Sequence, residues 1–154
     1  MLRDETASDV FAAFVVEAEP RLRRALTAVF GPELGREAAA EALAYGWEHW
    51  ERIAMMENPA GYLYRVGRDR GRRMKPLKSV AGSAAVSGDV WFEPGLEAAM
   101  RSLSERQRVV VSLLYAFDWS MSEVAELLGV SKSAVQSYER RALRILQKRL
   151  GVSA

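Results

Sequence analysis

Polar and positively charged side chains recur at helical spacing within the stretch SEVAELLGVSKSAVQSYERRAL, which runs from Ser122 to Leu143. The side chains that would share the outer face of its second part are Lys132, Ser133, Gln136, Ser137 and Arg140, with Arg141 and Arg144 extending the basic surface. Lys and Gln can read the edges of bases, while Ser and Arg can also hold phosphates. These residues are therefore candidates for contact with double-stranded DNA.

The residues around this face predict the helix-turn-helix that would position it. Such a motif needs a small residue where the second helix crosses the first, and Ala125 occupies that place. Gly129 can adopt the positive φ of the turn, and Val135 provides a buried aliphatic side chain on the second helix. Other apolar residues can complete a small core: Val124, Leu128, Val130, Leu143 and Leu146. An ordinary helical hairpin with a basic face is the alternative, but this spacing favours a DNA reader, whose second helix enters the major groove by its N-terminal part.

The composition excludes several kinds of chemistry. The chain of 154 residues has no cysteine and a single histidine, His49, so disulfides, thiolate nucleophiles and cysteine- or histidine-rich metal sites are not expected. It has no Gly-rich phosphate loop and no nucleophile elbow. We therefore expect a protein that is not an enzyme and that needs no cofactor and no metal. The sequence also has no apolar run as long as a membrane span, and its N-terminus is a poor signal peptide, so we expect a cytoplasmic location.

Charge is distributed unevenly, although the net charge is only +2. Basic residues cluster in the ranges 65–78 and 132–149, while acidic residues dominate the range 33–57. Basic clusters favour polyanions. The distribution therefore predicts two kinds of partner, although solvated helix faces would give a similar pattern.

The first half of the chain predicts three helices. Apolar spacing indicates a first helix over the stretch DVFAAFVVEAEPRLRRALTAVFG, bent or broken at Pro20. A second follows over ELGREAAAEALAYGWEHWERIAMM, which is rich in strong helix formers. Asn58 and Pro59 then form a start signal for a third helix, which we expect to weaken at Gly67 and Gly71.

A change of composition separates this half from the next. Residues 75–95 are rich in small residues and indicate a flexible linker, in which Trp91 and Phe92 are unusual. We therefore predict an all-α protein with two small helical domains, residues 1–74 and residues 96–154, joined by this linker.

The second half carries several start signals for short helices. Capping-box spacing occurs at Ser102 with Glu105 and again at Ser120 with Glu123. Ser131 can cap the last helix, which is the second helix of the predicted helix-turn-helix.

The second domain resembles the C-terminal domain of bacterial sigma factors, the part that binds the −35 promoter element. The resemblance is carried by an Arg-Gln-Arg helix, a Tyr-to-Ser turn, a Glu-hydrophobic-Ala triplet and a glycine before the reading helix. In this chain the matching residues are Leu103, Arg106, Gln107, Arg108, Tyr115, Ser120, Glu123, Val124, Ala125 and Gly129. The match covers about a third of the chain. Ser104 stands where proline is common in the family.

The first domain is similar to the sigma domain that binds the polymerase clamp and the −10 element, in the small extracytoplasmic-function (ECF) form. The resemblance rests on the order of the segments PRLRRAL, AEALAYGWEHW and NPAGYLYRVGR. It implies that Glu37 and Glu41 help to bind the polymerase. It also implies that the loop IAMMENPAGY captures a −10 base, with the DNA-contacting residues Tyr62, Tyr64, Arg65 and Arg68 on the helix that follows. Aromatic and arginine side chains suit single-stranded DNA, which is held by stacking and charge.

The first domain also departs from the family pattern. Glu37 and Ala40 stand where an Asp and a Gln are usual, Asp69 replaces a common Asn, and Arg73 replaces a usual Asp. The leading hypothesis is a sigma-like initiation factor that binds RNA polymerase core enzyme, through its β′ clamp and β flap, and double-stranded promoter DNA. An anti-sigma protein is a further expected partner, and no membrane contact is expected. A stand-alone helix-turn-helix regulator that no longer binds polymerase is the alternative.

Overall fold

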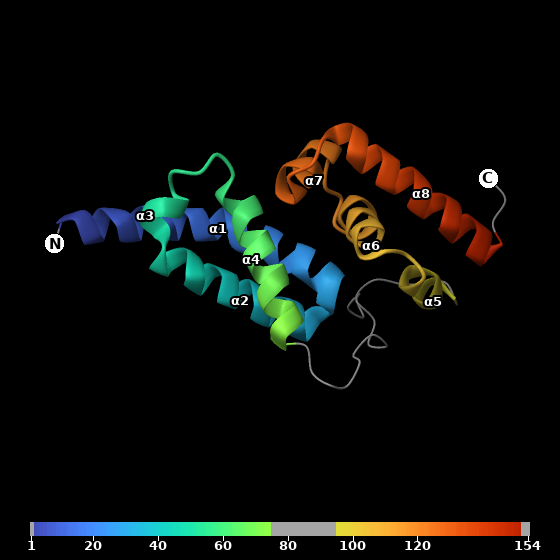
Figure 1. Ribbon diagram of the computed structural model, residues 1–154, viewed down its shortest axis with the longest axis horizontal. Coiled ribbons are helices and arrows are strands. Elements are labelled where there is room, and N and C mark those ends of the chain that lie inside the picture. The colour runs from blue at the N-terminus through green and yellow to red at the C-terminus, as the bar shows by residue number, and fades with distance from the viewer. Residues whose placement is uncertain (1, 75–94, 152–154) are drawn as a thin grey trace.

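The computed structural model describes residues 2–74 and 95–151, and within these ranges every regular element is a helix, in agreement with the predicted all-α class (Figure 1). The first half contains α1 (Leu2–Phe30), α2 (Pro32–Glu48), α3 (Trp50–Ile53) and α4 (Pro59–Met74). The second half contains α5 (Leu96–Arg101), α6 (Glu105–Val111), the π-helical turn η2 (Ser112–Ala116), α7 (Met121–Leu128) and α8 (Lys132–Leu150).

Helix α1 runs through Pro20 as one helix, so of the two predicted alternatives, a bend or a break, the break is wrong. Proline removes one backbone donor from a helix and leaves the carbonyl four residues before it without its partner. Here that residue is Val16, which is 75% exposed. Water can therefore satisfy the carbonyl on this side of the helix, and packing of the opposite side against α2 and α4 keeps the helix intact.

Helix α4 also continues where the sequence predicted it to weaken. Gly67 and Gly71 are both buried within it. A β carbon at Gly67 would lie 2.7 Å from Leu26 Cδ1, and one at Gly71 would overlap the ring of Phe30. These glycines therefore allow α4 to pack closely against α1, and the packing offsets their low helix propensity.

The start of α4 follows the prediction closely. The Asn58 side chain accepts a hydrogen bond through Oδ1 from the backbone nitrogen of Gly61 at 3.0 Å. Pro59 is the first residue of the helix, where its missing N–H costs nothing because that position has no intrahelical partner. The prediction of this helix start is thus confirmed.

In the second half, two of the three predicted caps are confirmed and one lies elsewhere. Ser120 forms a capping box with Glu123 at α7, and Ser131 caps α8 by accepting from the backbone nitrogen of Ala134 at 3.0 Å. Helix α6 is instead capped by Ser104, two residues later than expected, in a capping box with Gln107. The hydroxyl of Ser102 is not available for this cap because it donates to the carbonyl of Ala99 at the end of α5.

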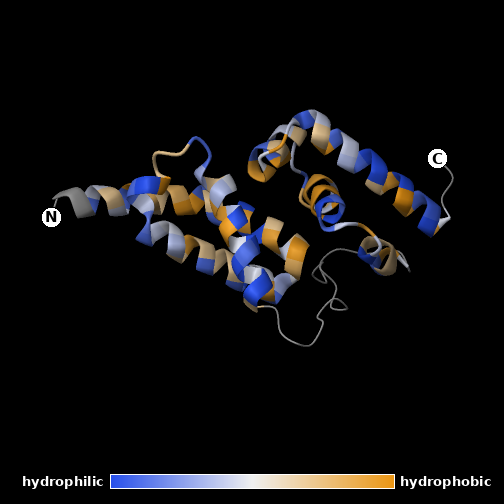
Figure 2. Cartoon of the chain, viewed as in Figure 1, coloured by the Kyte–Doolittle hydropathy of each residue, from blue (hydrophilic) through white to orange (hydrophobic). Residues whose placement is uncertain are grey.

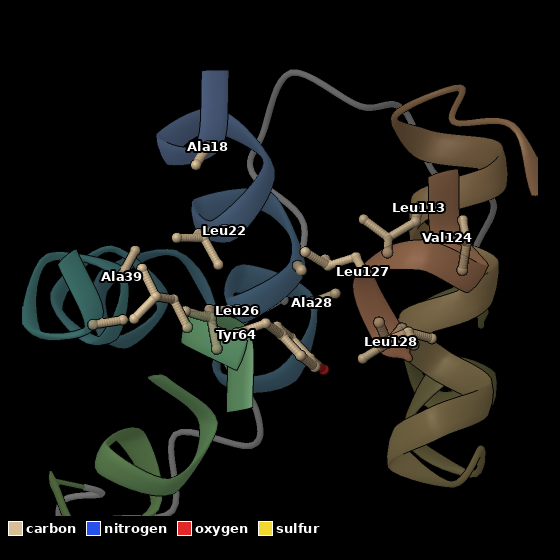
Figure 3. Packing of buried hydrophobic residues seen from close by; sticks show 14 of the residues in the cluster. Ala18, Leu22, Leu26, Ala28, Ala39, Tyr64, Leu113, Val124, Leu127 and Leu128 are labelled. Atoms are coloured by element: carbon tan, nitrogen blue, oxygen red, sulfur yellow. The ribbon is translucent and has the colours of Figure 1, made fainter. Parts of the chain in front are cut away.

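The two halves pack against each other and share buried apolar residues. Helix α1 contacts α6 and η2, and α4 contacts α7. Figure 3 shows Ala28 and Tyr64 of the first half facing Leu127 and Leu128 of α7. A smaller apolar cluster lies between α5, α6 and α8 and consists of Ala99, Leu103, Val111, Ala142 and Leu146. The predicted linker, with Trp91 and Phe92, lies outside the described residues except for Gly95.

The turn glycine of the second half provides a test of the fold. Gly129 has φ of 70°, and a β carbon there would lie 2.9 Å from Arg65 Nη2. We expect Gly129→Val to lower the free energy of unfolding by about 2 kcal/mol, because an L side chain resists positive φ and a β-branched one does so most strongly. Urea denaturation followed by circular dichroism measures this change. Unchanged stability together with unchanged DNA binding would contradict the role assigned to the turn.

Candidate nucleic-acid interface

The helix-turn-helix is built as the sequence predicted. Gly129 ends α7 in the left-handed conformation, and the backbone nitrogen of Val130 donates to the carbonyl of Ala125 at 3.0 Å. Val135 is completely buried, and Ala125 is nearly so. The turn therefore brings the start of α8 across α7 with small and aliphatic side chains at the contact, which fixes the direction in which the outer face of α8 points.

The outer face of α8 carries the predicted DNA-contacting side chains. The exposed ones are Lys132, Ser133, Gln136, Arg140, Arg141 and Arg144, and Ser137 is half-buried. Hydrophilic residues recur along this helix in Figure 2. Since positions three and four apart share a face of a helix, the structure brings these side chains together on one open basic surface. Such a surface suits the major groove of duplex DNA.

Two carboxylates of the second half, Glu139 of α8 and Glu123 of α7, are held by neighbouring groups. The Tyr115 hydroxyl donates to Glu139 Oε2 at 2.5 Å, and this hydrogen bond raises the pKa of Tyr115. In the capping box of α7, the backbone nitrogen of Ser120 donates to Glu123 Oε1 at 3.0 Å. That bond, with a smaller contribution from the Ser120 side chain, lowers the pKa of Glu123. Both acids thus have partners apart from the basic face of α8.

The predicted single-strand-binding residues of the first half do not form one open surface. Tyr62 is half-buried at the molecular surface, whereas Tyr64 is only 2% exposed. Burial raises the pKa of the Tyr64 hydroxyl. Arg68 Nη1 lies 3.7 Å from Glu105 Oε2 of the second half, and Arg65 is exposed but extends its guanidinium to Gly129. In this conformation three of the four side chains therefore face the second half.

An aromatic and basic cluster around Tyr62 was not predicted from the sequence. Arg52 Nη2 donates to the Tyr45 hydroxyl at 3.0 Å, and the guanidinium lies over the Tyr62 ring, 5.6 Å from its centroid. The hydroxyls of Tyr45 and Tyr62 are 3.4 Å apart, and this contact, followed by that with Arg52, lowers the pKa of Tyr62. His49 stacks on Tyr45 with ring centroids 4.1 Å apart. The four-residue spacing of Tyr45 and His49 is the sequence signal that could have indicated this cluster.

This cluster has the chemistry of a platform for unpaired bases. It combines aromatic faces with positive charge, since Arg70 also lies over the Tyr45 ring, 5.4 Å from its centroid. Bases stack on aromatic faces, and arginine attracts the backbone of a single strand. Met55 follows Arg52 closely in the sequence, in the loop between α3 and α4, and its side chain is 86% exposed. Trp50 is buried, while Trp47 is half-exposed against Phe11.

The two predicted polymerase-binding acids lie on the exposed side of α2. Glu37 and Glu41 are both exposed, and they are one helical turn apart. Glu41 Oε2 is 3.3 Å from Arg70 Nη1 of α4. The structure therefore leaves Glu37 open to solvent and gives Glu41 a partner that is itself partly exposed.

Other kinds of site are not found in the described part of the chain. No group of three or more His, Cys, Asp or Glu side chains there could hold a metal ion. No helix among the same residues is long and apolar enough to cross a membrane.

Comparison with known proteins agrees with the helix-turn-helix. Residues 95–146 match the family model for sigma-70, region 4. The ECF RNA polymerase sigma factor SigG of Mycobacterium tuberculosis is 29% identical over 145 residues, which covers 70% of this chain and 39% of SigG. The RNA polymerase sigma-F factor of Bacillus subtilis is 36% identical over 70 residues, covering 45% of this chain and 28% of that protein. The chain thus spans about two-fifths of SigG and less of sigma-F.

Comparison of folds extends the likeness to both halves. The sigma factor RpoE in its complex with the anti-sigma factor NepR, from Bartonella quintana, superimposes with a TM-score of 0.58 and 19% sequence identity. The superposition covers 94% of this chain and 98% of RpoE. Fold and motif together define an all-α protein that carries a helix-turn-helix similar to sigma-70 region 4. Within that class the chain resembles the ECF sigma factors, as its sequence indicated.

The capping box of α7 predicts a pH dependence of stability. The pKa of Glu123 is lowered in the folded chain relative to its ordinary value of 4.5. The ionised carboxylate therefore contributes its full stabilisation at pH values above 4.5. This contribution is lost as the pH falls through the lowered pKa of the folded chain. We expect Glu123→Gln to be less stable than the parent chain at neutral pH, by less than about 1 kcal/mol because the carboxylate is screened by solvent. The difference disappears in acid.

Urea denaturation at a series of pH values from neutral to acidic measures this dependence. Glu126→Gln is the matched control, because Glu126 lies on the same helix but outside the capping box. A difference between Glu123→Gln and the parent chain that stays constant with pH would contradict the assignment.

Proposed function

We propose that this chain is a sigma-like transcription initiation factor, which binds RNA polymerase core enzyme and directs it to specific promoters. The observation that carries the proposal is the exposed basic face at the start of α8, on a helix-turn-helix that matches sigma-70 region 4. Such a factor lends sequence specificity to the polymerase and performs no covalent chemistry. A cytoplasmic location belongs to the same proposal.

The DNA contacts are divided between the two halves in this proposal. Side chains of α8 read the −35 element as duplex, with Lys132 and Gln136 at the base edges and the arginines at phosphates. The first half holds the −10 element as a single strand, through the residues Tyr62, Tyr64, Arg65 and Arg68. The domains are residues 1–74 and 96–154, and residues 75–95 join them. A linker of that length reaches far enough to span two separate promoter elements, at roughly 3.3 Å per residue.

The protein partners follow from the exposed faces and from the relatives. Glu37 and Glu41 are accessible on α2 and are proposed to contact the β′ clamp of the polymerase, while the second half meets the β flap. The relative RpoE forms a complex with the anti-sigma factor NepR, and an anti-sigma protein is proposed as a partner of this chain as well. A stand-alone regulator would need the same face of α8 but no acidic contact on α2.

Base reading by α8 can be tested by substitution. We expect Lys132→Ala and Gln136→Ala each to weaken binding to a selected promoter duplex by about 1–3 kcal/mol and to relax sequence preference, because each removes a base contact. Binding site selection followed by fluorescence anisotropy measures both effects. Lys148→Ala is the control, since Lys148 is exposed on the same helix but far from its start. Unchanged preference in both variants would show that the reading face lies elsewhere.

Polymerase binding separates the proposal from the stand-alone regulator. We expect the chain to form a stable one-to-one complex with RNA polymerase core enzyme in analytical ultracentrifugation. Glu37→Lys combined with Glu41→Lys should weaken that complex about tenfold or more, because the charge of both side chains proposed to make the clamp contact is reversed. Glu17→Lys, at an exposed acid of α1, is the control. DNA binding without any association with polymerase would favour the stand-alone regulator.

A further inference from the structure

The carboxylate of Glu139 stands at the edge of the base-reading face of α8. Glu139 lies about one helical turn after Gln136 and about two turns after Lys132, so the three side chains share a side of the helix. Lys132 and Gln136 are exposed, whereas Glu139 is half-buried. An ionised carboxylate accepts hydrogen bonds and donates none. The direction in which Glu139 points therefore affects the side chains that are proposed to read bases.

Its own helix gives Glu139 no positive partner. Side chains three or four residues apart are neighbours on a helix. For Glu139 these neighbours are Val135, Gln136, Ala142 and Leu143, of which Gln136 alone is polar. In the described ranges Glu139 also takes part in no ion pair. The amide of Gln136, with its two N–H donors, is therefore the group on α8 that this carboxylate can engage.

A phenol from the preceding helix holds the carboxylate instead. The Tyr115 hydroxyl donates to Glu139 Oε2 at 2.5 Å. This hydrogen bond raises the pKa of Tyr115, so the hydroxyl keeps its proton and remains a donor at neutral pH. Within the part of the chain that the structure describes, the Gln136 amide has no hydrogen-bonding partner. The contact between Tyr115 and Glu139 thus leaves the Gln136 amide free.

The π-helical turn η2 places Tyr115 for this contact. It continues α6, which packs against α8 (Figure 1). The backbone nitrogen of Phe117 donates to the carbonyl of Ser112, five residues earlier, at 3.1 Å. A turn of this kind holds more residues than an α-helical turn, so it re-aims the side chains on it, and such turns are frequent at functional sites. Tyr115 is 59% exposed, so apolar burial does not account for its position.

We propose that Tyr115 is a positioning residue for base reading, which holds the Glu139 carboxylate so that the Gln136 amide stays free to read a base. This inference rests on the proposed function, which assigns base contact to Gln136. A free glutamine amide pairs with adenine through both its oxygen and its nitrogen. Without the Tyr115 hydroxyl, the carboxylate accepts from the Gln136 amide, and the amide is drawn away from the base.

The substitution Tyr115→Phe isolates the hydroxyl, because it keeps the ring and the net charge. Binding site selection with the parent chain supplies a selected duplex, and fluorescence anisotropy compares its affinity with that of a mixed-sequence duplex. We expect the ratio of the two affinities to fall about three- to tenfold. Binding to the mixed-sequence duplex and its salt dependence should not change, because no charge is gained or lost. An unchanged ratio would overturn the proposal.

The matched control for this substitution is Tyr138→Phe. Tyr138 precedes Glu139 on α8, and it is the ring of Tyr138 that lies against Arg106, 5.6 Å from the guanidinium carbon. Loss of its hydroxyl should leave the ratio of affinities unchanged. An equal fall in the ratio for Tyr138→Phe and Tyr115→Phe would show that the bond to Glu139 is not the cause, and would overturn the proposal.

Removal of the carboxylate separates positioning from a merely structural role. We expect Glu139→Ala to keep the ratio of the parent chain, and Tyr115→Phe with Glu139→Ala to restore the ratio that Tyr115→Phe loses, because no carboxylate is left to engage Gln136. The ratio is compared because loss of a negative charge raises the affinity for both duplexes. If the hydrogen bond only stabilised the fold, Glu139→Ala would lower the ratio as much as Tyr115→Phe and would rescue nothing. That outcome would overturn the proposal.

Coupling to Gln136 is measured by a double-mutant cycle. In the Gln136→Ala background, Tyr115→Phe should have no further effect on the ratio, and an equal loss with and without Gln136 would overturn the proposal. Urea denaturation followed by circular dichroism checks that each variant keeps its fold. A parent chain without preference between the two duplexes contradicts the proposed function and the proposal with it. A parent chain with clear preference and a silent Tyr115→Phe overturns the proposal alone.

Discussion

The contact between the two halves, of α1 with α6 and η2 and of α4 with α7, is the constraint on which the rest of the structure depends. It joins two helical units whose own cores are small, and it buries Leu127 and Tyr64 between them. Small helical units bury a limited share of their apolar surface, so contact between them adds stability that neither has alone. The same contact decides which charged side chains of α4 meet solvent and which meet the other half.

Helix ends carry much of the specificity of this contact. Asn58 satisfies the start of α4 and the end of α7, and Arg108 satisfies the end of α1. Backbone groups at helix ends need partners, and here the partners come from across the molecule. Because each of these hydrogen bonds needs a donor and an acceptor at fixed positions, they favour one relative position of the two halves. The contact can also be released, because water satisfies the same groups when the halves separate.

The arginines of α8 and those of α4 consequently differ in their surroundings. Arg140, Arg141 and Arg144 of α8 are exposed to solvent and open to a polyanion, whereas Arg68 and Arg72 of α4 are held by Glu105. The sequence shows both groups only as clusters of positive charge. Since partly exposed ion pairs contribute little individually, the contacts of the second group with Glu105 add only modestly to stability.

Local signals in the sequence determined the helix starts at Asn58, Ser120 and Ser131 and the turn at Gly129, because capping and positive φ depend on neighbouring residues alone. They also determined the open face of α8. Only the tertiary structure decided that α1 passes through Pro20, that Gly67 allows the close packing of α4, and that Tyr45 and Arg52 gather around Tyr62. It alone decided that Tyr64 is buried against the second half. Those outcomes depend on contacts between residues distant in the chain, which no local pattern encodes.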